Sequence, residues 1–250
     1  MASLPAVSKE HVFWHAPGTG PFGPRFRDRF DFSHEVSYFE KFTPWQLEMV
    51  KEIHLFTQMF WLEQTFSSLC KQDFMQGIEK VKITLRRSDW WWNENNYPLG
   101  INPKTGDSNV SLMHQEMAAT KKGQGGPWKL TAWGSAFLHL KSLKELEIEL
   151  ETSEDKLNEL KAIVEHAKTW RFPFRNRMVL STEGMEVKEG SWSAPFCLWS
   201  HRCPSCGSQG LCTGVAVPAP KNCADRTRLR MQNKGPDCYS FTLKWRVANA

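Results

Sequence analysis

The residues best suited to bind a metal ion are cysteines near the end of the chain. Six of the seven cysteines follow position 196. Cys203 and Cys206 stand in a Cys-Pro-x-Cys-Gly sequence, whose two thiolates can converge on one zinc ion while the glycine allows a tight turn. We predict a structural zinc site in this region. Its expected ligands are Cys203, Cys206, Cys212 and Cys223, with His201, Cys197 and Cys238 as alternates.

Two other interpretations of these cysteines stay open. They can be unpaired thiols of an intracellular protein, or they can form disulfides or a redox-active pair. A redox pair usually stands at the start of a helix after a strand, whereas residues 200–214 have the composition of a loop. A zinc ion with four protein ligands would be structural rather than catalytic, because no coordination position remains for water.

Positive charge accumulates beside the cysteines. Residues 171–250 carry 12 Lys and Arg against 5 Asp and Glu, and the whole chain has a net charge of +5. Arg226, Arg228, Arg230 and Lys234 follow the last of the four expected ligands, so they are candidates for binding nucleic acid or an acidic partner. The alternative is a solvated basic helix followed by a final strand, in which Phe241, Leu243 and Trp245 pack inward.

Three consecutive tryptophans, Trp90, Trp91 and Trp92, form a second candidate site. No regular element can bury three successive side chains on one face, so at least one ring is expected at the surface or under another segment. One hypothesis is an aromatic platform for a peptide, a sugar or a base. The alternative is that these rings cover one end of a sheet.

The sequence motifs of common enzymes are missing from this chain. It has no phosphate-binding glycine loop between a strand and a helix, no Gly-x-Ser-x-Gly and no His-Glu-x-x-His. It also has no apolar run long enough to span a membrane, and its N-terminus lacks the features of a secretion signal. These observations favour an intracellular protein, cytoplasmic or nuclear, that is not an enzyme and has no membrane partner.

Periodicity predicts the elements that must position these residues. Thr43-Pro-Trp-Gln predicts a helix start, and apolar spacing extends this helix to about residue 70. Alternation predicts strands over residues 81–85 and 146–150. A helix capped by Thr152 should follow the second strand and lead to an extended segment at 170–172. This strand–helix–strand order predicts one βαβ-like unit.

The expected fold class is therefore α+β, or mixed α/β, with a long N-terminal helix, a small sheet and a zinc-tied C-terminal region. Residues 1–42 are predicted to be an irregular arm rich in phenylalanine, and residues 43–182 an α/β body. An insertion over residues 88–130 should contain a short helix near 112–120. Residues 183–250 form the cysteine-rich basic region.

Parts of the chain resemble other sequences. The run LKELEIELETSEDKLNELKAIVEHAKTWRFP, together with VKITLRRSDWWW, HRCPSC and FTLKW, resembles a group of uncharacterised proteins of filamentous fungi. The leucine spacing of FLHLKSLKELEIEL is also similar to fungal F-box adaptor proteins, although no F-box and no second repeat are found. The first resemblance implies no activity. The sequence as a whole favours a non-enzymatic protein-interaction protein with structural zinc. The alternatives are nucleic-acid binding and an unrecognised enzyme.

Overall fold

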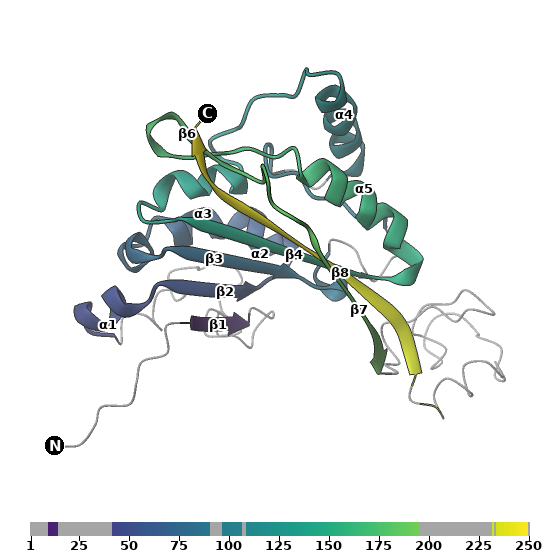
Figure 1. Ribbon diagram of the computed structural model, residues 1–250, viewed down its shortest axis with the longest axis horizontal. Helices are drawn as coiled ribbons and strands as arrows, with labels where there is room; N and C mark the ends of the chain where they lie inside the picture. The colour runs from purple at the N-terminus through teal and green to yellow at the C-terminus, as the bar shows by residue number, and fades with distance from the viewer. Residues whose placement is uncertain are drawn as a thin grey trace, which may run out of the picture.

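The computed structural model describes residues 10–14, 42–90, 97–106, 109–195, 232 and 234–249. These residues form helices and strands around one mixed β-sheet, in agreement with the expected mixed class (Figure 1). The helical elements are α1 (Pro44–Met49), α2 (Met59–Gln64), α3 (Phe66–Cys70), α4 (Val110–Lys121) and α5 (Leu157–Ala167), with 3-10 turns η2 (Asp73–Gly77), η3 (Arg87–Asp89), η5 (Trp133–His139), η6 (Glu154–Lys156) and η7 (Arg175–Arg177).

The sheet has the strand order β1-β2-β3-β4-β8-β6-β5, and β7 also pairs with β8. Strands β1 to β4 are parallel, whereas β8 runs antiparallel to β4 and to both β6 and β7. The bounds are β1 (Glu10–Trp14), β2 (Glu52–Phe56), β3 (Lys80–Leu85), β4 (Glu145–Ser153), β5 (Phe172–Pro173), β6 (Met178–Ser181), β7 (Lys188–Pro195) and β8 (Lys234–Asn249).

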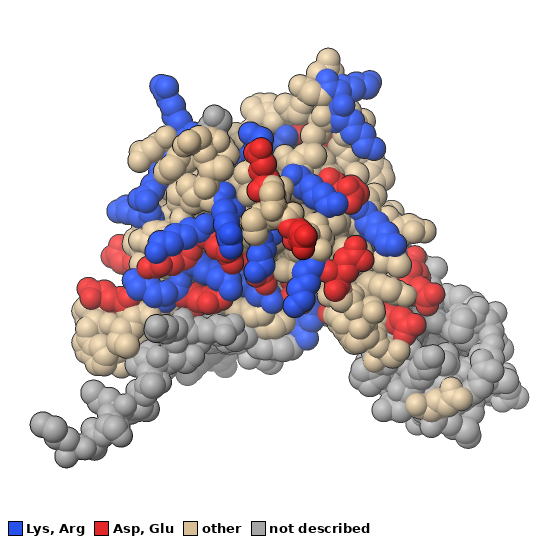
Figure 2. Space-filling view, viewed as in Figure 1, with Lys and Arg blue, Asp and Glu red and all other residues tan. Residues whose placement is uncertain are grey.

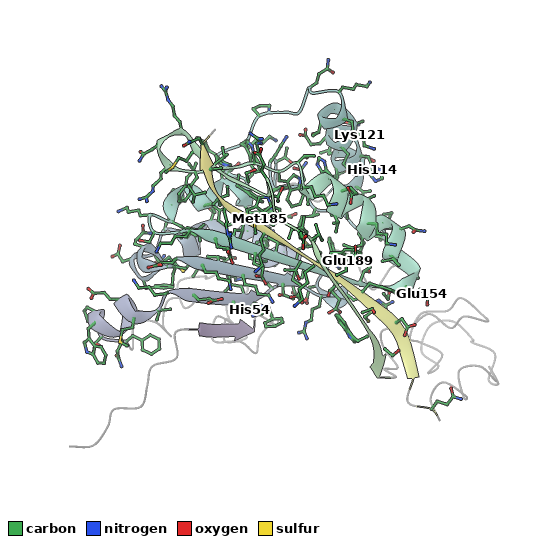
Figure 3. All side chains as sticks on the ribbon, in the orientation of Figure 1. His54, His114, Lys121, Glu154, Met185 and Glu189 are labelled. Carbon is green, nitrogen blue, oxygen red and sulfur yellow. The ribbon has the colours of Figure 1, made fainter. Side chains whose placement is uncertain are left out.

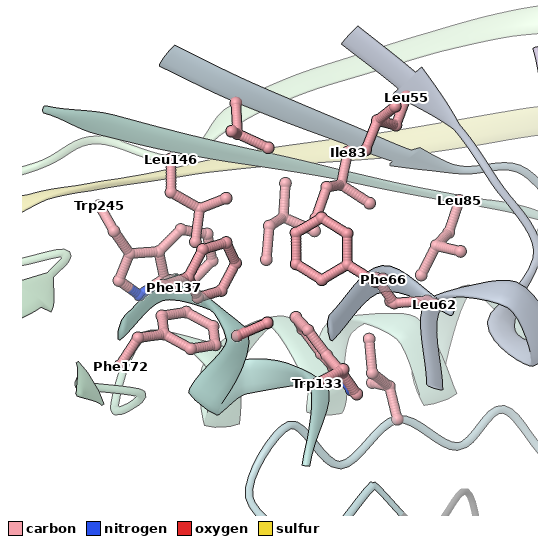
Figure 4. Close-up of a cluster of buried hydrophobic side chains, with 14 of the residues drawn as sticks. Leu55, Leu62, Phe66, Ile83, Leu85, Trp133, Phe137, Leu146, Phe172 and Trp245 are labelled. Atoms are coloured by element: carbon pink, nitrogen blue, oxygen red, sulfur yellow. The ribbon is translucent and has the colours of Figure 1, made fainter. Parts of the chain in front are cut away.

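The hydrophobic core lies between one face of the sheet and the helical elements. Figure 4 shows side chains from β2, β3, β4 and β8 meeting Leu62 and Phe66 from α2 and α3 and Trp133 and Phe137 from η5. Trp245 on β8 is fully buried, and its indole N–H donates a hydrogen bond to the carbonyl of Trp170 over 3.1 Å. Burying this indole with its polar atom satisfied anchors β8 in the centre of the sheet.

The prediction of one helix over residues 44–70 is wrong. It begins as expected, with Pro44 in its first turn and the Thr43 amide bonded to Gln46 Oε1 over 2.8 Å, but α1 ends at Met49. Residues 52–56 instead form β2, which pairs with β1 on one side and with β3 on the other. Ile53 and Leu55 face the core from alternate positions of this strand. Tertiary pairing has overridden a helical spacing that local sequence also allowed.

Two further predictions about the body are corrected. Thr152 does not cap a helix, because β4 continues to Ser153 in register with β8 and α5 begins only at Leu157. The expected βαβ-like unit, in which β4 and the extended segment after α5 would be parallel neighbours, is also absent from the described sheet. There β8 occupies the free edge of β4, and β5 pairs antiparallel with β6. The parallel connections lie earlier, between β2 and β3 and between β3 and β4.

Other local predictions are confirmed. The strands predicted over residues 81–85 and 146–150 are parts of β3 and β4, and the short helix predicted within the insertion is α4. Phe241, Leu243 and Trp245 are buried on one face of β8. Among the described residues, none of the helices has both the length and the apolar character needed to cross a membrane.

Candidate functional site

The cysteine-rich segment, residues 196–233, connects β7 to β8. These strands pair antiparallel, and the ladder ends with Pro195 opposite Lys234. Near this end Ser193 Oγ donates a hydrogen bond to Asp237 Oδ1 over 2.5 Å. The two ends of the segment therefore leave the sheet side by side, held by a ladder that closes the segment at its base.

Most of the predicted site residues lie outside the described part of the chain. These residues are Cys197, His201, Cys203, Cys206, Cys212, Cys223, Arg226, Arg228, Arg230, Trp91 and Trp92. Lys234 is described as the first residue of β8, at the base of the cysteine-rich segment. Across the described ranges, no three His, Cys, Asp or Glu side chains come together as a possible metal site. The zinc site and the basic patch stay predictions.

Cys238, an alternate metal ligand, lies within the β-sheet. It pairs with Ser153 of β4 on one side and with Trp192 of β7 on the other, and it is 5% exposed. Burial, followed by the negative charge of Glu151, raises the pKa of its thiol. Because the thiolate is the form that binds zinc, this environment disfavours Cys238 as a ligand.

Trp90 is part of the core. Its side chain is 3% exposed, and its indole N–H donates a hydrogen bond to the backbone carbonyl of Glu151 over 2.8 Å. The ring closes the end of the sheet after β3, which is the alternative that the sequence left open for this residue. An aromatic platform would have to use Trp91 and Trp92, which lie outside the described residues.

The sheet face opposite the core, here called the outer face, carries rows of charged side chains (Figure 2). In one row Glu52, Lys80, Glu145 and Arg246 stand opposite one another on β2, β3, β4 and β8. The charges of these side chains alternate in sign along the row. Lys80 Nζ lies 2.5 Å from Glu52 Oε1, and Arg246 Nε and Nη2 both lie 3.0 Å from Glu145 Oε2.

The next row is more deeply buried and centres on Glu147. This carboxylate is 7% exposed and lies 3.3 Å from Lys82 Nζ and 3.2 Å from Lys244 Nζ. Burial opposes its ionisation, but the hydrogen bonds and charges of the two lysines outweigh burial, so the pKa of Glu147 lies below its usual value. Lys82 also contacts Glu149 over 2.8 Å. The charges of this row neutralise one another within the sheet.

His54 lies at the β2 end of the same row (Figure 3). Its Nε2 is 2.9 Å from Thr84 Oγ1, and its ring centroid lies 4.3 Å from that of Phe56. Burial, followed by the charge of Lys82, lowers the pKa of His54 to about 4. The imidazole is therefore neutral at physiological pH and already holds a hydroxyl partner.

The sequence analysis did not predict that these charged side chains line up in rows across the sheet. The alternation of glutamates in β4 and of lysines in β3 indicates that both sets of side chains face away from the core. Their pairing depends on the register of β3, β4 and β8, which local sequence does not encode.

Comparison of the chain with models of protein families, with curated proteins and with solved structures found no match in any of the three. The function is therefore inferred from the residues and their geometry.

Proposed function

We propose that this chain is a non-enzymatic protein-interaction protein whose sheet-centred body presents the cysteine-rich segment, residues 196–233, to a partner. In this proposal a structural zinc ion, held by Cys203, Cys206, Cys212 and Cys223, gives the segment its binding shape. The observation that carries the proposal is the pairing of Pro195 with Lys234, which holds both ends of the segment together.

The ladder favours metal binding for an entropic reason. Bringing distant ligands of a flexible chain to one point costs conformational entropy, and part of this cost is met when the ends of the segment are already paired. Zinc binding then supplies folding free energy to a segment that also contains many small and polar residues. A site with four protein ligands serves structure, because water has no open coordination position.

The buried histidines of the described body fit a structural role. Its two buried histidines, His54 and His166, both have a pKa lowered to about 4, first of all by burial. A group with such a pKa is poorly matched to proton transfer near neutral pH. On the outer face the buried carboxylate of Glu147 is engaged by Lys82 and Lys244. Burial raises the pKa of Glu151, whose carboxylate accepts a hydrogen bond from the Arg87 backbone amide over 3.4 Å. Glu147 belongs to a structural ion-pair group, and His54 is the hydrogen-bond partner of Thr84.

The test is affinity capture from a native lysate with three forms of the full chain. The wild type is compared with the double variant Cys203→Ser, Cys206→Ser and with Cys238→Ser as the matched control. The proposal predicts a protein that the wild type and the control retain after nuclease treatment and that the double variant loses. Recovery of the same proteins with all three forms would contradict it, and so would recovery of the chain alone.

Nucleic-acid binding is the second candidate, and the position of Lys234 favours it. Because β8 begins at Lys234, the basic run Arg226, Arg228 and Arg230 leads directly into the base of the same segment. The outer face is a poor phosphate surface, since Lys82 and Arg246 there are paired with carboxylates. If the segment binds nucleic acid, affinity falls steeply with salt, and changing the three arginines to alanine flattens that dependence. Failure to bind DNA or RNA at low salt would exclude this candidate.

A further inference from the structure

Strand β7 has one edge that no described strand occupies. In the described sheet it pairs with β8 alone, and β8 pairs with β4 on its other side. The side chains from Lys188 to Ser193 are all exposed. Figure 1 shows β7 and β8 extending together beyond the helices at one end of the molecule. The described helices therefore leave this edge open to another extended chain.

The centre of this edge lacks the features that usually prevent strand addition. Proteins protect a free edge with charged side chains, prolines or bulges. In β7 the charged residues Lys188 and Glu189 stand at the beginning, and the register shift lies between Ser193 and Pro195 at the end. Residues 190–192 between them, Gly-Ser-Trp, carry no charge and no proline. Their backbone can therefore pair with a neighbouring strand.

The outer face of β7 carries a lysine, a glycine and a tryptophan in alternation. Lys188 stands opposite Thr242 of β8, which in turn stands opposite Glu149 of the outer face. Because successive side chains of a strand point to opposite faces, Gly190 and Trp192 lie on the same face as Lys188. Lys188 is exposed, and so is the indole of Trp192, by 42%.

These three positions are self-complementary in one antiparallel register. When Gly190 of one copy lies opposite Gly190 of a second copy, Lys188 of each copy lies opposite Trp192 of the other. Side chains directly opposite each other have Cβ atoms about 4.5–5.5 Å apart. The lysine ammonium can then lie over the exposed indole of the other chain in a cation–π contact. A twofold axis through the glycine pair makes this contact twice.

The neighbouring registers are less favourable. An axis at Glu189 places this carboxylate opposite its own copy, and like charges directly opposite each other destabilise an antiparallel pair. An axis at Ser191 places Lys188 opposite Ala194, so the cation–π contact is not made. With the axis at Gly190, no side chain stands at the centre of the contact. The sequence of β7 thus selects both a second copy of the same strand and one register.

We propose that the free edge of β7 binds the same edge of a second copy of this chain, antiparallel about Gly190, with Lys188 of each copy over Trp192 of the other. The two sheets become continuous, and backbone hydrogen bonds between the two β7 strands add to the two cation–π contacts. Because the strands run antiparallel, the cysteine-rich segments, which follow Pro195, leave the joined sheet at opposite ends. The contact does not include those segments, so this inference does not depend on the proposed function.

Sedimentation equilibrium of the full-length chain, from about 5 to 500 μM, is the first test. The proposal predicts a reversible equilibrium between monomer and dimer. A reductant is present throughout, because disulfides between copies would also produce dimers. Hydrogen exchange at low and high protein concentration then locates the contact, and amides within residues 188–192 should gain protection as the dimer forms.

Two single variants test the reciprocal contact. Lys188→Ala and Trp192→Ala each remove both cation–π contacts of a homodimer, so each should weaken dimerisation by roughly tenfold. A mixture of the two variants restores one contact, because the lysine kept in one chain faces the tryptophan kept in the other. The mixed dimer should be roughly threefold tighter than either homodimer, which also requires both variants to be folded. Trp45→Ala, which changes a similarly exposed tryptophan (50%) on α1, should leave dimerisation unchanged.

Several results would overturn the proposal. One is a protein that stays monomeric over the whole concentration range. Another is a dimer that neither Lys188→Ala nor Trp192→Ala weakens, or a mixture of the two that associates no more tightly than each alone. Concentration-dependent protection of residues 10–14 in place of residues 188–192 would assign the contact to β1, at the other end of the sheet, and would contradict it as well.

Discussion

The indole of Trp90 and the backbone carbonyl of Glu151 form a hydrogen bond of 2.8 Å between residues that stand 61 positions apart in the sequence. This bond joins the segment after β3 to the end of β4. It holds the buried Trp90 against β4, at the residue that pairs with Ser240 of β8.

Replacing Trp90 with phenylalanine should destabilise the protein. The change leaves the Glu151 carbonyl without its indole donor and removes part of a buried ring, so we expect a loss of about 1–3 kcal/mol. The free energy of unfolding in urea measures it. Trp45→Phe is the control, because Trp45 is 50% exposed and its substitution should cost less than about 0.5 kcal/mol. Equal stability of Trp90→Phe and wild type would contradict the structural role of Trp90.

Lys82→Met should cost far more stability than removal of an exposed lysine. Lys82 serves Glu147 and Glu149, and its loss leaves the buried Glu147 with Lys244 alone, at an expected cost of about 1–3 kcal/mol at neutral pH. Lys168→Met breaks an exposed pair with Glu165, where an effect of about 0.5 kcal/mol or less is expected.

The same variant should show a defined pH dependence. The folded-state pKa of Glu147 is lowered, so the stability that its ionisation contributes is present above its unfolded value and is lost as pH falls through the folded value. The difference between wild type and Lys82→Met should therefore shrink on acidification. A difference that stays constant into the acid range would exclude the ion pairs as its cause.

His54 should make the protein less stable in mild acid. Its folded-state pKa is about 4 against an ordinary 6.5, so between these values the unfolded chain takes up a proton that the folded protein does not. His54→Gln retains a partner for Thr84 but cannot titrate. Between about pH 7 and pH 4 the stability of wild type relative to this variant should fall by up to about 3 kcal/mol. Urea unfolding across this range measures it, and parallel pH profiles of the two proteins would refute the assignment.

Local sequence was sufficient for elements whose pattern leaves one solution. Val81, Ile83 and Leu85 alternate with polar residues, and only a strand buries all three on one face. In the segment that contains Ile53 and Leu55, apolar residues fit both a helix and a strand. The segment forms a strand because it pairs with β1 on one side and with β3 on the other, and both strands are distant from it in the sequence. Such non-local pairing cannot be obtained from one segment alone.

For the candidate site, local sequence predicts only the chemistry, and this zinc site stays a prediction. The spacing of Cys203 and Cys206 indicates a metal ligand pair without any structure. The strands that flank the cysteine-rich segment are paired at its two ends, and this depends on the register that puts Pro195 opposite Lys234. Cys238 was an expected alternate because it is a nearby cysteine, and only its position inside the sheet raises its thiol pKa and weakens that role.

The zinc content of the purified full-length protein tests the central claim most directly. The account predicts one zinc ion per chain by elemental analysis for the wild type and for Cys238→Ser, and its loss in the double variant Cys203→Ser, Cys206→Ser. A wild-type protein that is purified without chelators, supplied with zinc and still free of bound metal would contradict it.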